Sequence, residues 1–482
     1  MFRQNHNMIR SSYICENYDK SDKCEIEKQE INKEARTDFS SESQIIKTEK
    51  SRSIVENESQ VNSEMDKISQ ETIKENFPFP TFLEDQLEIL TEIVDAIEEG
   101  YKYIILESGV GKSAIAATLA NIYKSSFILS DNKELQEKYN KEYDLINNDK
   151  VYVSNHRDAF NEFEKLDKRK LLIVDDAHKF DENIADFFSY PIKLSAFDDE
   201  LIDSFYCEVR NKEKKEIDVG LDFINHLSLD DEMVNLIKYN IEENPDDWIW
   251  FYDDFSDKQI IFKSLKLGNI LKKYLLNKAE ICIFMSSTIL NKEIFADELG
   301  LDISEVKFIH KDFPFSSDTN QIYLRNCADM RWKYFQNVYL VIPFIEDILE
   351  KHKNEKGIIH TDNPKYTNYI KNQINNPRFM FHIDDDDLKE FKNSSNSVLV
   401  SEDRVEGMDF PKDSCRFQII LRQHLIPNDE IAKYKDNESN WYSYKKAIYL
   451  VQLLQRAARS EDDGCITYIL DERILTTIRK DI

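Results

Sequence analysis

The segment YIILESGVGKSAIAA, from Tyr103 to Ala117, combines residue types that bind phosphate groups. Its first four residues are apolar, as in a buried strand; ESGVGKS follows as a tight loop, and a helix is favoured from Ala114 onward. Glycines let such a loop curve around phosphate oxygens, and N–H groups at the start of the helix donate to them. Lys112 would add positive charge, and Ser113 would hold Mg²⁺. The residues expected to bind the phosphates are Ser108, Gly109, Val110, Gly111, Lys112 and Ser113.

Hydrolysis of a bound nucleotide needs two carboxylates beside this loop, one that holds the metal ion through water and one that orients the attacking water. The run LLIVDDAH, residues 171–178, has the composition of a second buried strand and ends in Asp175 and Asp176. Such a pair is a weak signal alone, but it becomes a strong one about 60 residues after a GKS loop. The two segments predict a P-loop nucleotide site, although Leu106 stands where the consensus G-x-x-x-x-G-K-[ST] has its first glycine.

The chain that must position these residues is long enough, at 482 residues, for two or three domains. Its 41% hydrophobic content is that of a globular protein, and no apolar run approaches the roughly 18 residues of a membrane helix. No secretory signal is visible, and the seven scattered cysteines form no C-x-x-C pair. We therefore expect an intracellular protein, cytoplasmic or associated with the nucleoid (nuclear in a eukaryote), with neither disulfides nor zinc.

The formal net charge of −28 disfavours non-specific binding to nucleic acid, which depends on neutralising phosphates, but it leaves room for a local basic groove. Residues 1–76 contain neither Gly nor Pro and carry 12 Lys and Arg against 16 Asp and Glu. This composition predicts a disordered or loosely helical tail, or alternatively an interaction arm that orders on binding. A Pro-containing extended segment begins at Phe77, and apolar spacing from Leu87 to Ile97 predicts an amphipathic helix closed by Gly100.

Further segments follow in an ordered series. The first part of the series comprises FPFPTFLEDQ, ESGVGKSAIA, FILSDNKELQEKY, VYVSNHRDAF and IVDDAH. The second part comprises ICIFMSSTIL, KGIIHTDNPKYTNYI, SVLVSEDRVEGMDF and QLLQRAARSEDDGCITYILDERI. In content and order they resemble the DinG and XPD-like group of superfamily-two DNA helicases, over Phe77 to Ile482. The resemblance implies an α/β protein with two RecA-like P-loop motor domains that bind ATP and Mg²⁺ between them.

The resemblance also implies roles for single residues. Gln86 would contact adenine, a surface glutamine being the alternative, while Asp175 would hold the metal and Asp176, where the family has Glu, would position the water. Ser286 and Thr288 would couple the ATP site to the strand-binding face. The second domain would approach ATP with Glu406, Gly407, Asp409 and Gln452 and with two candidate arginine fingers, Arg456 and Arg459. The alternative for the arginines is a salt-bridged helix surface.

Three departures from the family pattern matter. No cysteine lies between Lys112 and Asp175, where XPD-type members hold an iron–sulfur cluster, so we expect no such cluster and no duplex-splitting wedge. Asp176 replaces glutamate in DDAH. Gln455 replaces the glycine of Q-x-x-G-R-x-x-R.

An insertion over residues 195–258 stands in the place of the family's arch domain. Residues 196–258 carry 19 Asp and Glu against 6 Lys and Arg, a net charge of −13. We expect it to be mostly helical and either simply solvated or a contact for a basic protein partner. The acids Asp384 to Asp387 are expected in an exposed loop.

These observations predict four regions: a tail over 1–76, a first motor domain over 77–194 and 259–312, the acidic insertion over 195–258, and a second motor domain over 313–482. The leading function that the resemblance implies is ATP-dependent movement along single-stranded nucleic acid, DNA being favoured over RNA, in the 5′ to 3′ direction, with duplex unwinding as an additional output. The alternative is a nucleotide-dependent binding module that recruits proteins through the insertion or the tail. A nuclease is disfavoured, because 76 residues are too few for an exonuclease domain.

Overall fold

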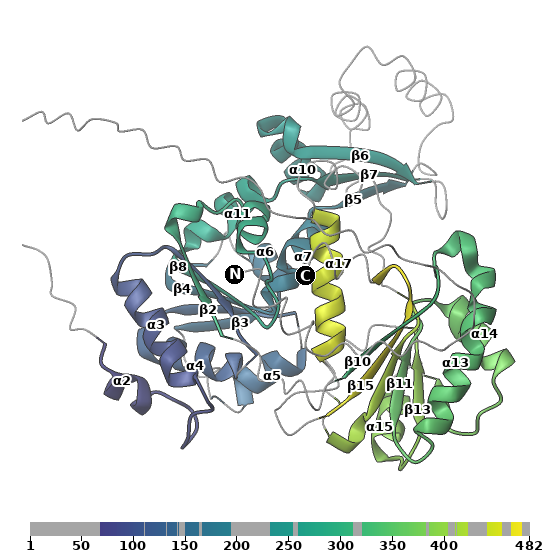
Figure 1. Cartoon of the computed structure of the whole chain (residues 1–482). Helices are drawn as coiled ribbons and strands as arrows, with labels where there is room; N and C mark the ends of the chain where they lie inside the picture. The colour runs from purple at the N-terminus through teal and green to yellow at the C-terminus, as the bar shows by residue number, and fades with distance from the viewer. Residues whose placement is uncertain are drawn as a thin grey trace, which may run out of the picture. The chain divides into compact units, whose positions relative to one another are not determined.

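The computed structural model describes residues 68–109, 111–131, 133–141, 143, 150–162, 166–193, 232–253, 259–311, 321–381, 385–402, 410, 412–422, 441–455 and 464–474. Most of their strands belong to two six-stranded parallel sheets, each covered by helices (Figure 1). Within these ranges no helix is long and apolar enough to span a membrane.

The first sheet has the strand order β3-β2-β4-β8-β1-β9, and its central strands are almost entirely apolar. Such strands need cover on both faces, because successive side chains point to opposite sides. In β1, Ile104 and Leu106 face one hydrophobic layer, and Tyr103 and Ile105 face the other. The strands are β1 (Tyr103–Glu107), β2 (Ser126–Leu129), β3 (Val151–Ser154), β4 (Arg169–Asp175), β8 (Ala279–Ser286) and β9 (Val306–His310).

Helices cover both faces of this sheet. On the side of Ile104 lie α2 (Gln70–Glu75), α3 (Gln86–Glu98), α4 (Lys112–Tyr123) and α5 (Lys133–Lys141). On the side of Ile105 lie α6 (His156–Glu162), α7 (Phe180–Phe187), α11 (Gly268–Tyr274) and α12 (Lys292–Glu298). Short 3₁₀ turns complete the unit: η2 (Ala177–Lys179), η5 (Leu276–Lys278) and η6 (Ile303–Glu305).

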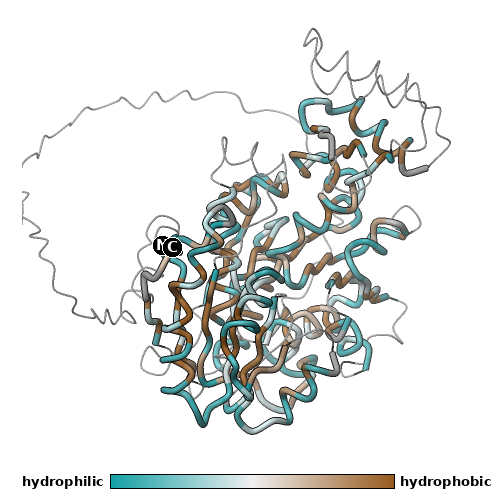
Figure 2. Tube along the Cα trace, turned by 90° about the vertical axis from the view of Figure 1, so that its right-hand side faces the viewer, coloured by the Kyte–Doolittle hydropathy of each residue, from teal (hydrophilic) through white to brown (hydrophobic). Residues whose placement is uncertain are grey.

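The second sheet has the order β10-β15-β14-β11-β13-β12 and is also parallel throughout. Its strands are β10 (Ile322–Ala328), β11 (Gly357–His360), β12 (Phe379–Phe381), β13 (Val398–Ser401), β14 (Phe417–Ile420) and β15 (Ile466–Asp471). The helices α13 (Val338–Lys351) and α14 (Pro364–Gln373) cover one face, and α15 (Asp385–Asn393) and α17 (Trp441–Leu454) cover the other. The turns η7 (Trp332–Asn337) and η8 (Lys412–Ser414) flank them. The hydropathy colouring of Figure 2 follows this layering, with hydrophobic strands and helices of mixed colour.

The predicted fold class, two α/β units with parallel sheets, is confirmed. A third, antiparallel sheet lies at the base of the acidic insertion. It consists of β5 (Tyr190–Lys193), β7 (Gln259–Ser264) and β6 (Trp248–Asp253), in the order β5-β7-β6, and is joined by α10 (Glu232–Glu243) and η4 (Pro245–Asp247). This sheet spans both expected boundaries, 195 and 258, so the described part of the insertion is not only helical. Residues 194–231 and 254–258 lie outside the described residues.

Two local expectations need correction. Residues 70–75, expected to be part of a disordered or loosely helical tail, form the helix α2, which is packed on the core, because Ile73 inserts into the first hydrophobic layer and the Ser69 side chain caps the helix by accepting from Thr72 N–H. The folded unit thus includes Ile68 rather than beginning at Phe77. The acids from Asp385 to Asp387 do not lie in a loop but begin α15, where negative charge suits the helix N-terminus.

Candidate nucleotide-binding site

The predicted phosphate loop joins β1 to α4. Gly111 is the N-cap of α4 at φ +48°, a left-handed conformation that glycine adopts without strain. A Cβ at this position would come within 1.9 Å of Gln86 Nε2, so any larger residue would displace the Gln86 side chain. Because the N-cap is glycine, it has no side chain that could accept from the first N–H groups of α4. Val110 lies outside the described residues.

Gln86, at the start of α3, is only 2% exposed, which excludes the surface alternative. Its side-chain oxygen accepts from Leu83 N–H at 2.7 Å, and its Nε2 donates to the Gly111 carbonyl at 3.3 Å. The structure therefore brings Gln86 against the phosphate loop. Its contact with adenine stays a prediction.

The acid pair lies at the carboxyl end of β4, on the same edge of the sheet as the loop. In the order β4-β8-β1, Asp175 pairs with Met285 and Glu107 pairs with Ser286, so the two strand ends are level. Asp176 adopts φ +55°, a left-handed conformation that Asp tolerates better than most residues, and it begins the η2 turn.

Asp175 is 2% exposed, and both of its oxygens accept hydrogen bonds. The Tyr139 hydroxyl donates to Oδ2 at 2.8 Å, and the Asp176 N–H donates to Oδ1 at 3.0 Å. Burial, reinforced by the negative charge of Asp176, raises the pKa of Asp175 to about 6, although Lys112 and the Tyr139 hydrogen bond oppose the rise. The opposing effect of Lys112 is consistent with the placement of the acid pair and the phosphate loop at one edge of the sheet.

Glu107, which no sequence motif indicates, connects the loop strand to the segment after β8. Its carboxylate accepts from the N–H groups of Ile289 at 2.7 Å and Leu290 at 2.8 Å, and it lies 2.9 Å from His310 Nδ1. Two N–H donors and a histidine satisfy a carboxylate that is 5% exposed. The only signal in the sequence was an acid ending an apolar strand.

The predicted coupling residues lie next to this connection. Ser286 Oγ lies 3.0 Å from Nδ1 of His178, a residue of the η2 turn that follows the acid pair. The same Ser286 Oγ accepts from Thr288 N–H at 3.0 Å. The two predicted coupling positions are therefore buried and linked to each other and to the η2 turn.

One face of α17 contacts the same region. The Lys445 ammonium, 2% exposed, donates to Asp181 Oδ1 at 2.6 Å and to the His178 carbonyl at 3.0 Å, and lies 3.2 Å from Glu182. Burial lowers the pKa of Lys445, but the two acids outweigh it and the pKa lies above its ordinary value. The Tyr449 hydroxyl donates to Glu182. A helix that packs on the second sheet is thus bonded to the helix that follows the acid pair.

Further along this face, two glutamines bind the segment after β8. Gln452 Nε2 donates to Thr288 Oγ1 at 2.8 Å and to Ser287 Oγ at 3.1 Å, and Gln455 accepts from Thr288 Oγ1 at 3.4 Å. Gln455, which replaces the family's glycine, therefore makes a contact that glycine could not make. The approach of five further residues to ATP stays a prediction, because they lie outside the described residues: Glu406, Gly407, Asp409, Arg456 and Arg459.

The donor set fits Mg²⁺, which takes oxygen ligands and commonly keeps several waters beside one or two protein groups and substrate phosphates. Ser113 and Asp175 supply such oxygens. In the described ranges no group of three or more His, Cys, Asp or Glu is placed to enclose a metal ion. The absence of an iron–sulfur cluster stays a prediction.

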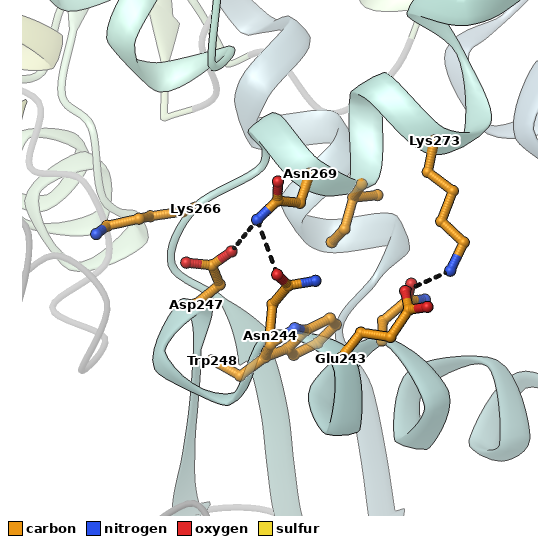
Figure 3. Close-up of a pocket in the computed structure, with 9 residues that line it drawn as sticks. Glu243, Asn244, Asp247, Trp248, Lys266, Asn269 and Lys273 are labelled. Carbon is orange, nitrogen blue, oxygen red and sulfur yellow. Dashed lines mark hydrogen bonds and ion pairs between the residues drawn. The ribbon is translucent and has the colours of Figure 1, made fainter.

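A separate cavity of about 170 Å³ lies where α10, η4 and α11 meet (Figure 3). Its polar side chains already pair with one another: Asn269 donates to Asp247 at 2.8 Å and to Asn244 at 3.1 Å, and Lys273 binds Glu243 at 2.7 Å. None of its lining residues comes from the phosphate loop or the acid pair, so it is not part of the nucleotide site.

Comparison with known proteins agrees with this geometry. Residues 367–482 match the helicase C-terminal domain family. The predicted resemblance to XPD-like helicases is confirmed. An apo structure of XPD superposes with a TM-score of 0.56 at 13% identity, covering 82% of this chain and 98% of that one.

A second XPD-type structure gives the same result. Xpd4 from S. tokodaii superposes with a TM-score of 0.57 at 14% identity, covering 82% of this chain and 97% of that one. No curated protein sequence matches the chain. At these identities the superpositions establish the fold, and the residues of the site must carry any argument about activity.

Proposed function

We propose that this XPD-like chain is an ATP-hydrolysing motor that moves along single-stranded nucleic acid, DNA in preference to RNA, in the 5′ to 3′ direction. The observation that carries the proposal is that β1 and β4 end level in one parallel sheet, on either side of β8, so that the phosphate loop after β1 and the acid pair at the end of β4 lie at the same edge. A lysine and a carboxylate at one edge of a sheet are groups that phosphoryl transfer uses.

The residues divide the work as follows. N–H groups at the start of α4 donate to the β- and γ-phosphates, and Lys112 neutralises part of their charge. Ser113 and Asp175 hold Mg²⁺, which when bound neutralises charge that develops on the phosphate oxygens. Asp176 orients the attacking water. Arg456 and Arg459 would stabilise the transition state from the second unit.

The contacts of α17 supply the coupling that a motor needs. Any change in the η2 turn or in the segment after β8 alters partners of Lys445, Gln452 and Gln455 on a helix of the second sheet. The predicted arginine pair directly follows this helix in the sequence. Nucleotide state and the position of the arginines would therefore change together.

Steady-state ATP hydrolysis, measured without nucleic acid and with single-stranded DNA or RNA, tests the proposal. We expect Mg²⁺-dependent turnover that single-stranded DNA stimulates more than RNA does. Movement is measured separately, by displacement of streptavidin from biotinylated DNA ends, where release from the 3′ end alone is expected. Absence of turnover under all conditions would overturn the motor.

The second candidate, a nucleotide-dependent binding module, is favoured by Asp176, whose carboxylate is one methylene shorter than that of glutamate. Such a module would bind ATP and recruit a protein through the acidic insertion or the tail without processive movement. ATP binding without turnover, together with ATP-dependent capture of a basic protein, would favour it.

A further inference from the structure

Tyr139 is a buried aromatic residue that contacts the acid pair. It lies on α5 with no exposed surface, and its ring packs 5.7 Å from that of Tyr143 in the hydrophobic layer shared with α3 and α4. An aromatic residue at such a position could serve packing alone. Its hydroxyl, however, points out of the hydrophobic layer to Asp175 Oδ2 at 2.8 Å.

The partner of this hydroxyl is a predicted magnesium ligand. The phenol donates to Asp175, which ends β4, so a separate element, α5, supplies the donor that holds this carboxylate. The hydroxyl carries a single proton, and that proton is directed to the carboxylate oxygen.

The second oxygen of Asp175 is held by the N–H of Asp176. Both oxygens are therefore fixed from the protein side, and the rotation of the carboxylate about its last bond is set before any ligand binds. Each carboxylate oxygen can accept more than one hydrogen bond, so both keep capacity toward water or metal. Groups that orient metal ligands in this way typically contribute about 10- to 100-fold to metal affinity.

Resting on the proposed function, we propose that Tyr139 is a positioning residue of the magnesium site. It holds the Asp175 carboxylate in the orientation in which Asp175, together with Ser113, would hold Mg²⁺.

The test compares Tyr139→Phe with Tyr123→Phe in the full chain. Tyr123, at the end of α4, also has a buried hydroxyl, but that hydroxyl lacks a hydrogen-bond partner. The readouts are the Mg²⁺ dependence of binding of a fluorescent ADP analogue and direct Mn²⁺ binding by electron paramagnetic resonance in the presence of ADP. Neither depends on hydrolysis. Thermal unfolding in EDTA checks that both variants fold.

For Tyr139→Phe we expect the half-saturating Mg²⁺ concentration to rise about 10- to 100-fold, with unchanged affinity for the analogue in EDTA. Tyr123→Phe should match the wild type. In an Asp175→Asn background, Tyr139→Phe should cause no further loss, because the two residues act as one unit.

Three results would overturn the inference, and they separate it from the proposed function. If nucleotide binding by the wild type responds to Mg²⁺ and Tyr139→Phe shows the same Mg²⁺ dependence, the role of Tyr139 is refuted while the proposed function stands. Equal losses in both tyrosine variants, or full additivity with Asp175→Asn, would assign the effect to packing. A wild type without Mg²⁺-dependent nucleotide binding would remove the nucleotide site itself, and the role of Tyr139 with it.

Discussion

In each of the two parallel sheets, one inner strand is followed by a turn and a helix. The two turns differ in which groups accept from the first N–H groups of the helix. At the β1–α4 turn, the N-cap is Gly111, which has no side chain that could accept from the helix. At the β11–α14 turn, Asn363 accepts from Lys365 N–H, and Pro364 in the first turn has no N–H at all. We therefore expect the first turn to bind phosphate and the second to serve only as a stable helix start.

The largest expected effect comes from removing the lysine of the first turn. Lys112→Ala should reduce ATP turnover to background while leaving the unfolding temperature near that of the wild type, because a loop lysine adds charge to phosphates and little to the core. The matched change in the second turn, Lys365→Ala, should leave turnover unchanged. Hydrolysis by Lys112→Ala near the wild-type rate would refute the distinction between the two turns.

Asp176 is expected to show the next largest effects. Its carboxylate is one methylene shorter than that of glutamate, and misplacement of about 1 Å can cost on the order of 10²-fold. Asp176→Glu should therefore raise kcat by up to that factor, whereas Asp176→Asn should abolish turnover, because an amide cannot accept a proton from water. If both variants matched an active wild type, Asp176 would not be the catalytic carboxylate.

The raised pKa of Asp175 predicts an effect on stability. A pKa of about 6 in the folded state against 3.8 means that the native state holds its proton more tightly, so stability is lost as pH rises through about 6. In EDTA at pH 8, Asp175→Asn should be more stable than the wild type by on the order of 3 kcal/mol. The gain should shrink as pH falls through about 6.

Urea unfolding in EDTA at pH 8 and at pH 5.5 measures this difference. The exposed Asp297→Asn, on α12, is the control and should change little at either pH. A gain that does not depend on pH would show that buried charge is not its cause.

The smallest effect should come from the β11–α14 turn, where Asn363 caps the helix. Asn363→Ala should lower the free energy of unfolding by about 1 kcal/mol, the usual contribution of an N-cap, without changing ATP turnover. Asn363→Ser, which keeps a capping oxygen, should restore most of the loss. A marked loss of turnover in a folded Asn363→Ala variant would show that the second turn also serves the nucleotide.

The sequence was sufficient wherever the signal was local. The apolar strands, the GKS loop and the acid pair after β4 lie where their patterns predict, because strand composition and a glycine loop determine structure over short distances. Gln86 was placed at the start of a helix, and its closeness to Gly111 agrees with the expected neighbourhood.

What was missed depends on contacts between distant segments. Tyr139 resembles any aromatic residue on the buried face of a helix, and only the fold shows that its hydroxyl reaches a residue 36 positions away. Lys445 resembles a solvated lysine until its partners 264 positions earlier are known. The helix α2 has a single fully buried apolar residue, too little for a pattern to reveal.

The burial of Lys445 has a consequence for experiments at different ionic strengths. Salt screens exposed charges within about 10 Å at 0.1 M but acts far less on pairs shielded from water. Binding to the phosphates of a nucleic acid should therefore weaken steeply with added salt. The bond between Lys445 and Asp181, with the lysine 2% exposed, should persist. In a salt titration, bound nucleic acid should therefore dissociate while the contacts of α17 with the residues that follow the acid pair remain. The titration would separate the binding of nucleic acid from the contacts between the two sheets.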